Sequence, residues 1–275
     1  MPSFVVVPQW QGSGSDRAMR LIDGAEAIRG DLPSAHTTTV EVPAGAGDSL
    51  GTGIARASSL RTVHERLREH LVDLPGPAIT IGGDCSVSLA AVGHAWEHSA
   101  GSLAVVWLDA HPDLNTPASS PSGCFAGMVL RAICGDGVDG LVAPLPIDPS
   151  RVVLAGARSF DVAEDAYIAD HGIAVVSAEQ LATPDALLAA IAATGATSVY
   201  LHIDVDVLDP AEIVGLGNPV PFGVTGLQLV DLARTIAGSY EIAGATIAQF
   251  APVSAEAAID DLPTLLRVIG AIAGR

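Results

Sequence analysis

The sequence predicts an open α/β/α fold, in which helices cover both faces of a mainly parallel sheet. Short runs of Val, Ile and Leu alternate with segments of helical character along the chain. Several of these runs are apolar on both faces, as expected for parallel strands that are covered by helices. Strands that alternate with helices in this way are typical of α/β proteins.

Each predicted strand is one of the apolar runs, and the segments between them are the predicted helices. In chain order, strands are expected near residues 3–8, 77–82, 103–109, 151–156, 173–177, 198–204 and 243–249. Helices are expected at residues 15–30, 55–73, 86–98, 163–171, 178–195, 224–238 and 256–273. No internal repeat, linker or low-complexity tract interrupts this pattern, so residues 1–275 are expected to form one domain.

The charge of the chain limits its partners. A net charge of −18 argues against binding to nucleic acid or to an anionic membrane surface. All 13 basic residues are Arg, so chemistry that needs a Lys Schiff base or a Lys phosphate loop is excluded. These features favour a small-molecule substrate.

Cysteine usage and the N-terminus predict a cytoplasmic location. The three cysteines form no CxxC or other paired motif, which fits a reducing compartment. The segment "MPSFVVVPQW" has no basic region and a short apolar run, so it is interpreted as a first strand and not as a signal peptide. No uncharged apolar stretch reaches the roughly 18 residues of a membrane span.

Acidic motifs follow three of the predicted strands. In "WLDAHPDLNT", Asp109, His111 and Asp113 alternate by two, which would place them on one side of an extended segment. In "HIDVDVLDP", His202, Asp204 and Asp206 alternate in the same way, and "IGGDCS" carries Asp84 and Cys85. In open α/β sheets, ligands bind at the C-terminal ends of the strands.

Clustered carboxylates with a histidine predict a metal site. Aspartate and imidazole ligands suit Mn²⁺, Mg²⁺ or Zn²⁺, and four carboxylates would over-neutralise a single divalent ion. Two ions are therefore expected, with a bridging water activated as hydroxide. Such centres hydrolyse both phosphoesters and carbon–nitrogen bonds, so the residues alone leave the electrophile open.

The motifs "GGDCS", "DAHPDLNT" and "HIDVDVLDP" resemble, in order and spacing, those of the arginase/agmatinase/formiminoglutamase (ureohydrolase) family. The likeness extends from about residue 75 to residue 252. It implies a three-layer α/β/α sandwich with a mainly parallel, about eight-stranded sheet. It also implies two Mn²⁺ ions per chain at the strand ends, and a homo-oligomer, either a trimer or a hexamer.

The same resemblance implies a set of site residues. One ion would bind Cys85, Asp109, Asp113 and Asp204, and the other would bind His111, Asp109, Asp204 and Asp206. A bridging hydroxide would attack a guanidinium or related amidine carbon. Asn115, Ser120 and Ser122 match positions that bind the α-carboxylate of an amino acid substrate, and Asp161, beside Glu164, matches one that contacts the α-amino group. Asp84 would lie behind the ligands, and Asp209 would fix a loop.

The chain departs from the family pattern at three positions. Cys85 replaces the metal-binding histidine of GGDHS, which weakens the first site for Mn²⁺ or shifts its preference toward Zn²⁺. Ala126 replaces the histidine that relays a proton, and Gln249 replaces the carboxylate that pairs with the guanidinium. With Cys in this motif, the chain resembles the actinobacterial hydrolases of N-hydroxyarginine. The hydroxylated guanidine of that substrate is less basic than the guanidine of arginine.

Two other functions stay open on these residues. One is a binuclear-metal hydrolase of a formimino group or another substrate without a guanidine. The other is a ureohydrolase-like protein that binds a ligand without catalysis, which the substitutions at Cys85, Ala126 and Gln249 favour. The pair His94 and His98 has helical spacing but no evident third ligand, so it predicts packing or a solvated face.

Overall fold

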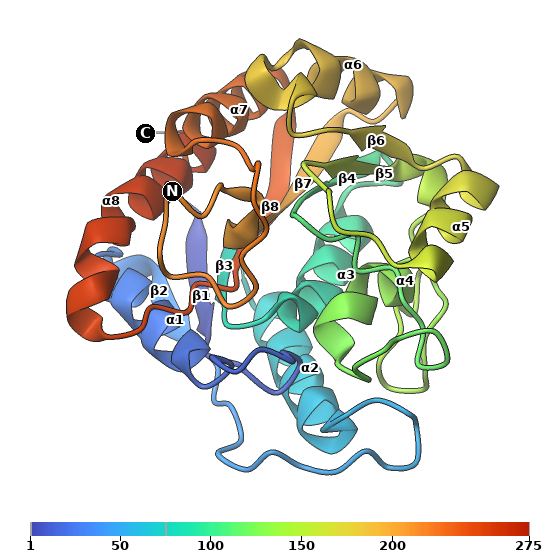
Figure 1. The fold of residues 1–275 in the computed structure, drawn as a ribbon, viewed down its shortest axis with the longest axis vertical. Coiled ribbons are helices and arrows are strands. Elements are labelled where there is room, and N and C mark those ends of the chain that lie inside the picture. Colours follow the sequence, from blue (N-terminus) through green and yellow to red (C-terminus); the bar gives the residue numbers. More distant parts are fainter. Residues whose placement is uncertain (1, 75, 275) are drawn as a thin grey trace.

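The computed structural model describes residues 2–74 and 76–274, and its centre is a parallel sheet of eight strands (Figure 1). The strands lie in the order β2-β1-β3-β8-β7-β4-β5-β6, and all seven neighbouring pairs are parallel. Their bounds are β1 (Ser3–Val7), β2 (Thr37–Thr39), β3 (Ala78–Gly82), β4 (Leu103–Leu108), β5 (Val152–Ala155), β6 (Ala174–Val176), β7 (Ser198–Asp204) and β8 (Glu241–Ala248).

Strand β2 is the one strand that the sequence did not predict. The seven predicted strands are confirmed, whereas β2 falls inside a stretch that was interpreted as irregular. It consists of three threonines that pair with β1 at the edge of the sheet, and two of the three are exposed. An edge strand with polar, exposed side chains lacks the apolar run that identified the others.

Two layers of helices cover the sheet, which confirms the three-layer α/β/α architecture (Figure 1). One face packs against α1 (Arg20–Gly30), α6 (Asp185–Ala193), α7 (Gly226–Ser239) and α8 (Ala255–Ile272). The other face packs against α2 (Ala57–Val72), α3 (Ser88–His98), α4 (Val129–Ile133) and α5 (Val162–His171). Alternation along β1 shows the two cores, because Phe4 and Val6 join the first whereas Val5 and Val7 join the second.

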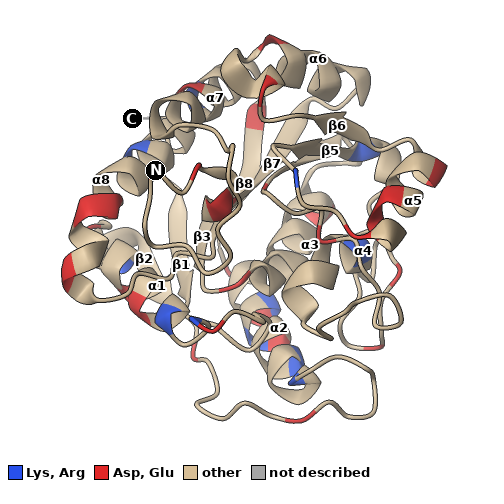
Figure 2. Cartoon of the chain, in the orientation of Figure 1, with Lys and Arg blue, Asp and Glu red and all other residues tan. Residues whose placement is uncertain are grey.

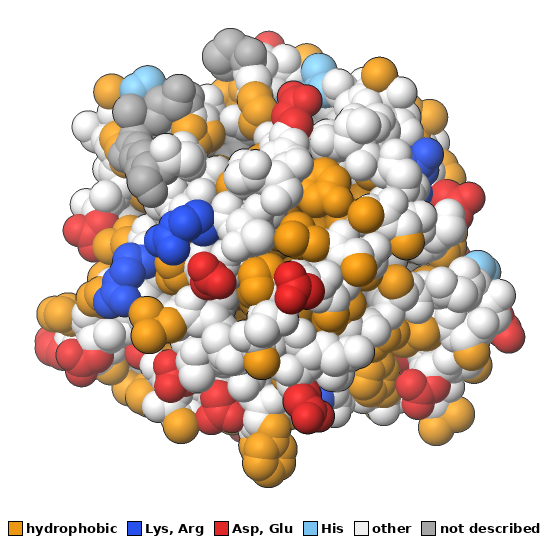
Figure 3. Space-filling model, turned by 90° about the horizontal axis from the view of Figure 1, so that it is seen from above, with side chains coloured by type: hydrophobic (Ala, Val, Ile, Leu, Met, Phe, Trp, Pro, Cys, Tyr) orange, Lys and Arg blue, Asp and Glu red, His pale blue; other side chains and the backbone are white. Residues whose placement is uncertain are grey.

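The surface reflects the acidic composition. Acidic residues occur on helices and loops around the whole fold (Figure 2). On the face shown in Figure 3, acidic side chains are spread across the surface, whereas basic side chains are sparse. Across residues 2–74 and 76–274, no helix is both long enough and apolar enough to span a membrane.

The strand order brings the three motifs together. "GGDCS" follows β3, "DAHPD" follows β4, and "HIDVD" lies at the end of β7. Strands β3, β8, β7 and β4 are consecutive neighbours in the sheet, and because they are parallel their C-terminal ends share one edge. Gln249 directly follows β8, so a fourth candidate site residue starts from the same edge.

Candidate metal centre and substrate cavity

The carboxylates of the acidic motifs converge at this edge of the sheet. Asp109, Asp113, Asp204 and Asp206 are all buried, although they come from two motifs about 95 residues apart in the chain. Burial removes these groups from water, which is costly for a carboxylate unless a proton, a hydrogen bond or a cation compensates it. The cluster therefore requires a compensating partner.

Neither acidic motif is extended along its whole length. The prediction that alternation along an extended segment places these side chains on one side was therefore wrong. β4 ends at Leu108, His111 N donates to Asp109 Oδ1 at 2.7 Å, and Asp113 has a φ of 52°. β7 ends at Asp204, whose Oδ1 accepts a hydrogen bond from Asp206 N at 2.8 Å in a 3₁₀ turn. The side chains meet through turns closed by these carboxylates and not through strand alternation.

His111 joins the two loops electrostatically. Its Nδ1 atom lies 3.1 Å from Asp206 Oδ2 and 3.5 Å from Asp109 Oδ1. Burial opposes the charged imidazole, but hydrogen bonds to both carboxylates raise the pKa of His111 to about 12. Burial and the Asp206 charge raise the pKa of Asp109 to about 7. A protonated His111 imidazole stabilises both carboxylates through these contacts.

Cys85 lies on the other side of the cluster. Its Sγ atom donates to Asp204 Oδ2 at 3.1 Å and accepts a hydrogen bond from Gln249 Nε2 at 3.5 Å. Burial, together with the charges of three neighbouring aspartates, raises the pKa of the Cys85 thiol well above its usual range. Asp84 points away from the cluster and accepts hydrogen bonds from Gly12 N, Ser86 N and Gln9 Nε2.

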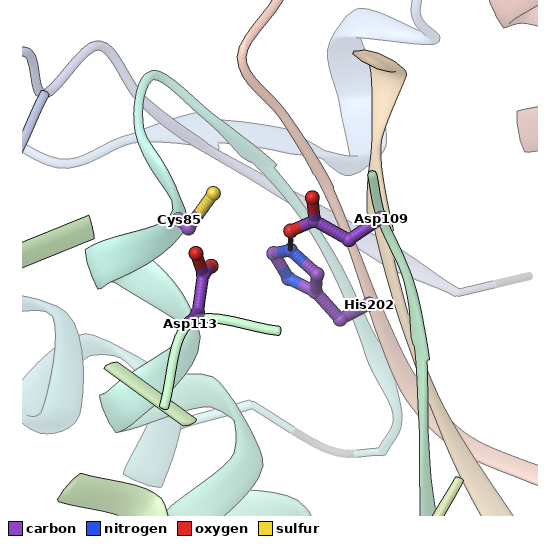
Figure 4. A group of neighbouring side chains, drawn as sticks. All are labelled: Cys85, Asp109, Asp113 and His202. Carbon is purple, nitrogen blue, oxygen red and sulfur yellow. Dashed lines mark ion pairs between the residues drawn. The ribbon is translucent and has the colours of Figure 1, made fainter. Parts of the chain in front are cut away.

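Two groups of side chains have the spacing of a metal-ligand set. In the first, single ligand atoms of Cys85, Asp109, Asp113 and His202 all lie within 4.8 Å of one another (Figure 4). In the second, the same holds for Asp109, His111 and Asp206. Asp109 is common to both. The sequence showed that His202 alternates with Asp204 and Asp206, but it gave His202 no role as a ligand.

These residues fit divalent cations. Asp113 Oδ2 and His202 Nε2 are buried and lack a hydrogen-bond partner among the residues that the structure describes. Burial raises the pKa of Asp113 and Asp204 well above the usual range, as expected when neighbouring carboxylates share a site without a cation. Oxygen, nitrogen and sulfur donors around two subsites that share Asp109 suit a pair of borderline divalent ions.

A cavity of about 270 Å³ opens beside the cluster. It is lined by the cluster residues Cys85, His111, Asp113, Asp204 and Asp206, and by all the predicted substrate residues, Asn115, Ser120, Ser122, Asp161 and Gln249. Ala126 also lines the cavity, so a methyl group stands where the family resemblance implied a proton-relaying histidine. The predicted substrate residues and the acidic cluster thus share one space.

Hydrogen bonds fix part of this lining. Asn115 Nδ2 donates to Asp161 Oδ2 at 2.8 Å, and Ser119 Oγ donates to Asn115 Oδ1 at 2.8 Å. Glu164 accepts from Leu114 N at 2.9 Å and from Asp161 N at 2.9 Å, which ties α5 to the loop after β4. Ser120 and Ser122 lie nearer the solvent, with their hydroxyl oxygens 3.5 Å apart.

Hydrogen bonds from two side chains to backbone atoms stabilise the loop after β7. Asp209 accepts hydrogen bonds from Ala211 N, Phe222 N and Gly223 N, so its carboxylate closes this loop. Arg158, which sequence reasoning did not single out, donates to the carbonyl oxygens of Asp206 at 2.7 Å and Val220 at 2.8 Å. No motif marks such an arginine, because these two partners are backbone atoms 48 and 62 residues away.

Comparison with known proteins assigns the family. The model of the arginase family matches residues 18–262. The chain belongs to the arginase family. It is 36% identical over 190 residues to an arginase of Entamoeba histolytica, covering 64% of each protein. It is also 36% identical over 162 residues to an arginase of Bacillus subtilis, covering 54% of this chain and 52% of that one. The matches thus span about half to two thirds of these curated relatives.

Solved structures of similar proteins share the fold. The E. histolytica arginase in complex with L-ornithine superposes with a TM-score of 0.86 at 25% identity, covering 100% of both chains. The formimidoylglutamase of B. subtilis gives a TM-score of 0.75 at 18% identity, covering 98% of this chain and 86% of that one. The second likeness shows the fold alone. The family resemblance of the motifs is confirmed.

Proposed function

We propose that this arginase-family chain is a metal-dependent hydrolase that cleaves a carbon–nitrogen bond of a guanidino or amidino group in an arginine-like amino acid. The observation that carries the proposal is that buried carboxylates and His111 line the same cavity as polar side chains that could bind an amino acid. A cavity of about 270 Å³ suits a small substrate.

Two divalent ions are part of the proposal, with Mn²⁺ as the expected metal. Cys85, Asp109, Asp113 and Asp204 would hold one ion, and Asp109, His111, Asp204 and Asp206 would hold the other. When bound, the ions would supply the Lewis acidity that makes water a nucleophile at neutral pH. The sulfur of Cys85 favours a softer ion such as Zn²⁺ at the first position.

The cavity lining would orient the substrate. Asn115, Ser120 and Ser122 offer hydrogen-bond donors for an α-carboxylate, and the Asp161 carboxylate offers a charge partner for an α-amino group. Such contacts would place the far end of the side chain against the acidic wall. Ala126 has no ionisable group, so a cavity water would have to give the leaving amine its proton.

We propose N-hydroxyarginine as an arginine-like substrate that Gln249 could accommodate. Its amide lines the cavity and is hydrogen-bonded to Cys85, where a charged guanidinium would need a carboxylate partner. Hydroxylation lowers the basicity of a guanidine, so a neutral amide suffices as its partner. The expected products are hydroxyurea and ornithine.

A product panel tests this function. The protein, loaded in parallel with Mn²⁺ or Zn²⁺, would be incubated with arginine, N-hydroxyarginine, a formimino amino acid and phosphoesters. Urea or hydroxyurea that disappears in Asp206→Ala supports the proposal. Release of formamide alone would assign a formimino substrate, and release of phosphate alone would contradict a carbon–nitrogen hydrolase. If no product forms with either metal, the protein binds a ligand without catalysis and the proposal is wrong.

The proposal extends to the state of the protein. We expect one domain over residues 1–275, a cytoplasmic location and a homo-oligomer, either a trimer or a hexamer. All three cysteines, which lie in the described part of the chain, are free, as fits a reducing compartment. Analytical ultracentrifugation at several concentrations measures the oligomer, and a monomer at all of them would contradict it.

A further inference from the structure

The imidazole of His202 is buried in β7 with an unused nitrogen. Its side chain is fully excluded from solvent, and its Nε2 atom has no hydrogen-bond partner among the described residues. A buried nitrogen without a partner is unfavourable, so it needs either a donor or a cation nearby. The ligand sets proposed above do not use this histidine.

The ring orientation is fixed by the sheet. β4 and β7 pair in register at Trp107 and His202, and the two rings stack with centroids 3.5 Å apart and planes 11° from parallel. The Nδ1 atom lies 2.8 Å from Ser88 Oγ in α3. Stacking and this hydrogen bond together direct Nε2 toward the acidic cluster, where it lies 3.8 Å from Asp109 Oδ2 (Figure 4).

The hydrogen-bond network determines which nitrogen carries the proton. Ser88 Oγ donates its one proton to Thr246 Oγ1 at 3.0 Å, so it is an acceptor toward His202. Nδ1 therefore carries the hydrogen, and Nε2 presents a bare lone pair to a carboxylate oxygen. Two acceptors that face each other in a buried site repel, and a cation between them removes the repulsion.

We propose that His202 is a metal ligand of this centre and supplies, through Nε2, the imidazole that position 85 lacks. Together with Cys85, Asp109 and Asp113 it completes a set of one sulfur, one nitrogen and two carboxylate donors within 4.8 Å of one another. Mixed sulfur, nitrogen and carboxylate donors of this kind would suit a zinc-like ion. The inference rests on the proposed metal centre but not on any substrate.

The competing role, in which His202 only orients Asp109, fits the geometry less well. It would require Nε2 to donate to Asp109 Oδ2, but their separation of 3.8 Å exceeds hydrogen-bond distance. That oxygen also already accepts from Trp107 Nε1 at 3.1 Å. Moreover, a proton on Nε2 of a neutral ring would leave Nδ1 beside a serine oxygen whose proton is used by Thr246.

X-ray absorption of the unmodified, metal-loaded protein tests the ligand directly. Elemental analysis of the same sample gives the number of bound ions, and the multiple-scattering signal of imidazole gives the number of histidine ligands. We expect two imidazoles per chain, from His111 and His202. Bound ions with only one imidazole would overturn this inference and leave the proposed function standing, whereas the absence of bound ions would overturn both.

A pair of variants tests the relocation of the imidazole. His202→Ser should weaken binding of one ion by about tenfold or more, which is about 1.4 kcal/mol. Adding Cys85→His to His202→Ser returns an imidazole to the cluster and should restore two histidine ligands and most of the lost affinity. His64→Gln, a matched histidine removal outside the cavity, should leave metal affinity unchanged. Wild-type affinity in His202→Ser would contradict the inference, and if that variant does not fold, the measurement on unmodified protein decides.

Discussion

The thiol of Cys85 donates a hydrogen bond to Asp204 across 3.1 Å, although the two residues are 119 positions apart in the chain. This contact joins the loop after β3 to the end of β7 across the intervening strand β8. It places sulfur among carboxylates. We therefore expect Cys85 to influence which metal this centre prefers.

Replacing the sulfur should change which metal binds best. In Cys85→Ser, a hydroxyl can still donate to Asp204, but the soft ligand is lost. We expect the affinity for Zn²⁺ to fall by about tenfold or more relative to the affinity for Mn²⁺. Competition titrations with a chelator measure both constants. Equal losses for the two ions would show that Cys85 does not bind the metal.

Substrate analogues should separate the roles of the cavity walls. Asp161→Asn keeps a hydrogen-bonding side chain but removes the charge proposed to pair with an α-amino group. We expect KM for the amino acid substrate to rise by about tenfold, with kcat nearly unchanged, because the contact is equal in ground and transition states. For a substrate analogue that lacks the α-amino group, KM should be the same in the wild type and in Asp161→Asn.

Ser122→Ala is the matched control, because it removes a hydroxyl proposed to bind the carboxylate on the same cavity. Ser122→Ala should raise KM for the analogue that lacks the α-amino group. It should not change KM for an analogue that lacks the α-carboxylate. If Asp161→Asn weakens both analogues alike, Asp161 acts through the loop that it ties to Asn115 and not through the amino group.

Removing Arg158 should destabilise the loop that carries Asp206. Arg158→Met keeps most of the side-chain volume but leaves the carbonyls of Asp206 and Val220 without their donor. We expect the free energy of unfolding to fall by about 1–3 kcal/mol, measured by denaturant titration. Arg158→Lys, which keeps one charged donor, should lose less. A loss confined to metal affinity, with unchanged stability, would contradict this role.

His64 should make stability depend on pH. Burial in the helix layer, followed by the charge of Arg68, lowers the pKa of His64 to about 4 from 6.5. Between these values the unfolded chain binds more protons than the folded chain, so stability is lost as pH falls from 6.5 toward 4. The contribution of His64 is about 3 kcal/mol at most.

The measurement is the difference in unfolding free energy between pH 7 and pH 4.5, for wild type and His64→Gln. The variant should show the smaller difference, because the group that titrates is gone. His36→Gln, which removes an exposed histidine, should behave as wild type. An identical pH dependence in wild type and His64→Gln would rule out the buried histidine as its source.

The sequence predicted the parts of this molecule that depend on local pattern. Seven strands were readable because each is a buried apolar run, and β2 was not, because its threonines lie at an exposed edge. Asp109 and Asp204 were found because carboxylates that end apolar strands are unusual. Their turns were not foreseen. Asp113 has a positive φ and its carbonyl accepts hydrogen bonds from Leu130 N and Arg131 N, contacts that the local sequence does not indicate.

Residues whose role depends on distant partners were missed. The tautomer of His202 is set by Ser88 in α3 and Thr246 in β8, which lie 114 and 44 positions away, and Arg158 binds backbone atoms of another loop. Within its own strand, His202 is one more buried residue among apolar neighbours. Only the sheet order makes these side chains neighbours.

Anomalous diffraction from crystals grown with excess Mn²⁺ tests the central claim most directly. The account predicts two anomalous peaks in the acidic cluster, one beside Cys85, Asp109 and Asp113 and the other beside His111, Asp109 and Asp206. A well-ordered crystal with metal in the solvent and no anomalous density among these side chains would contradict it.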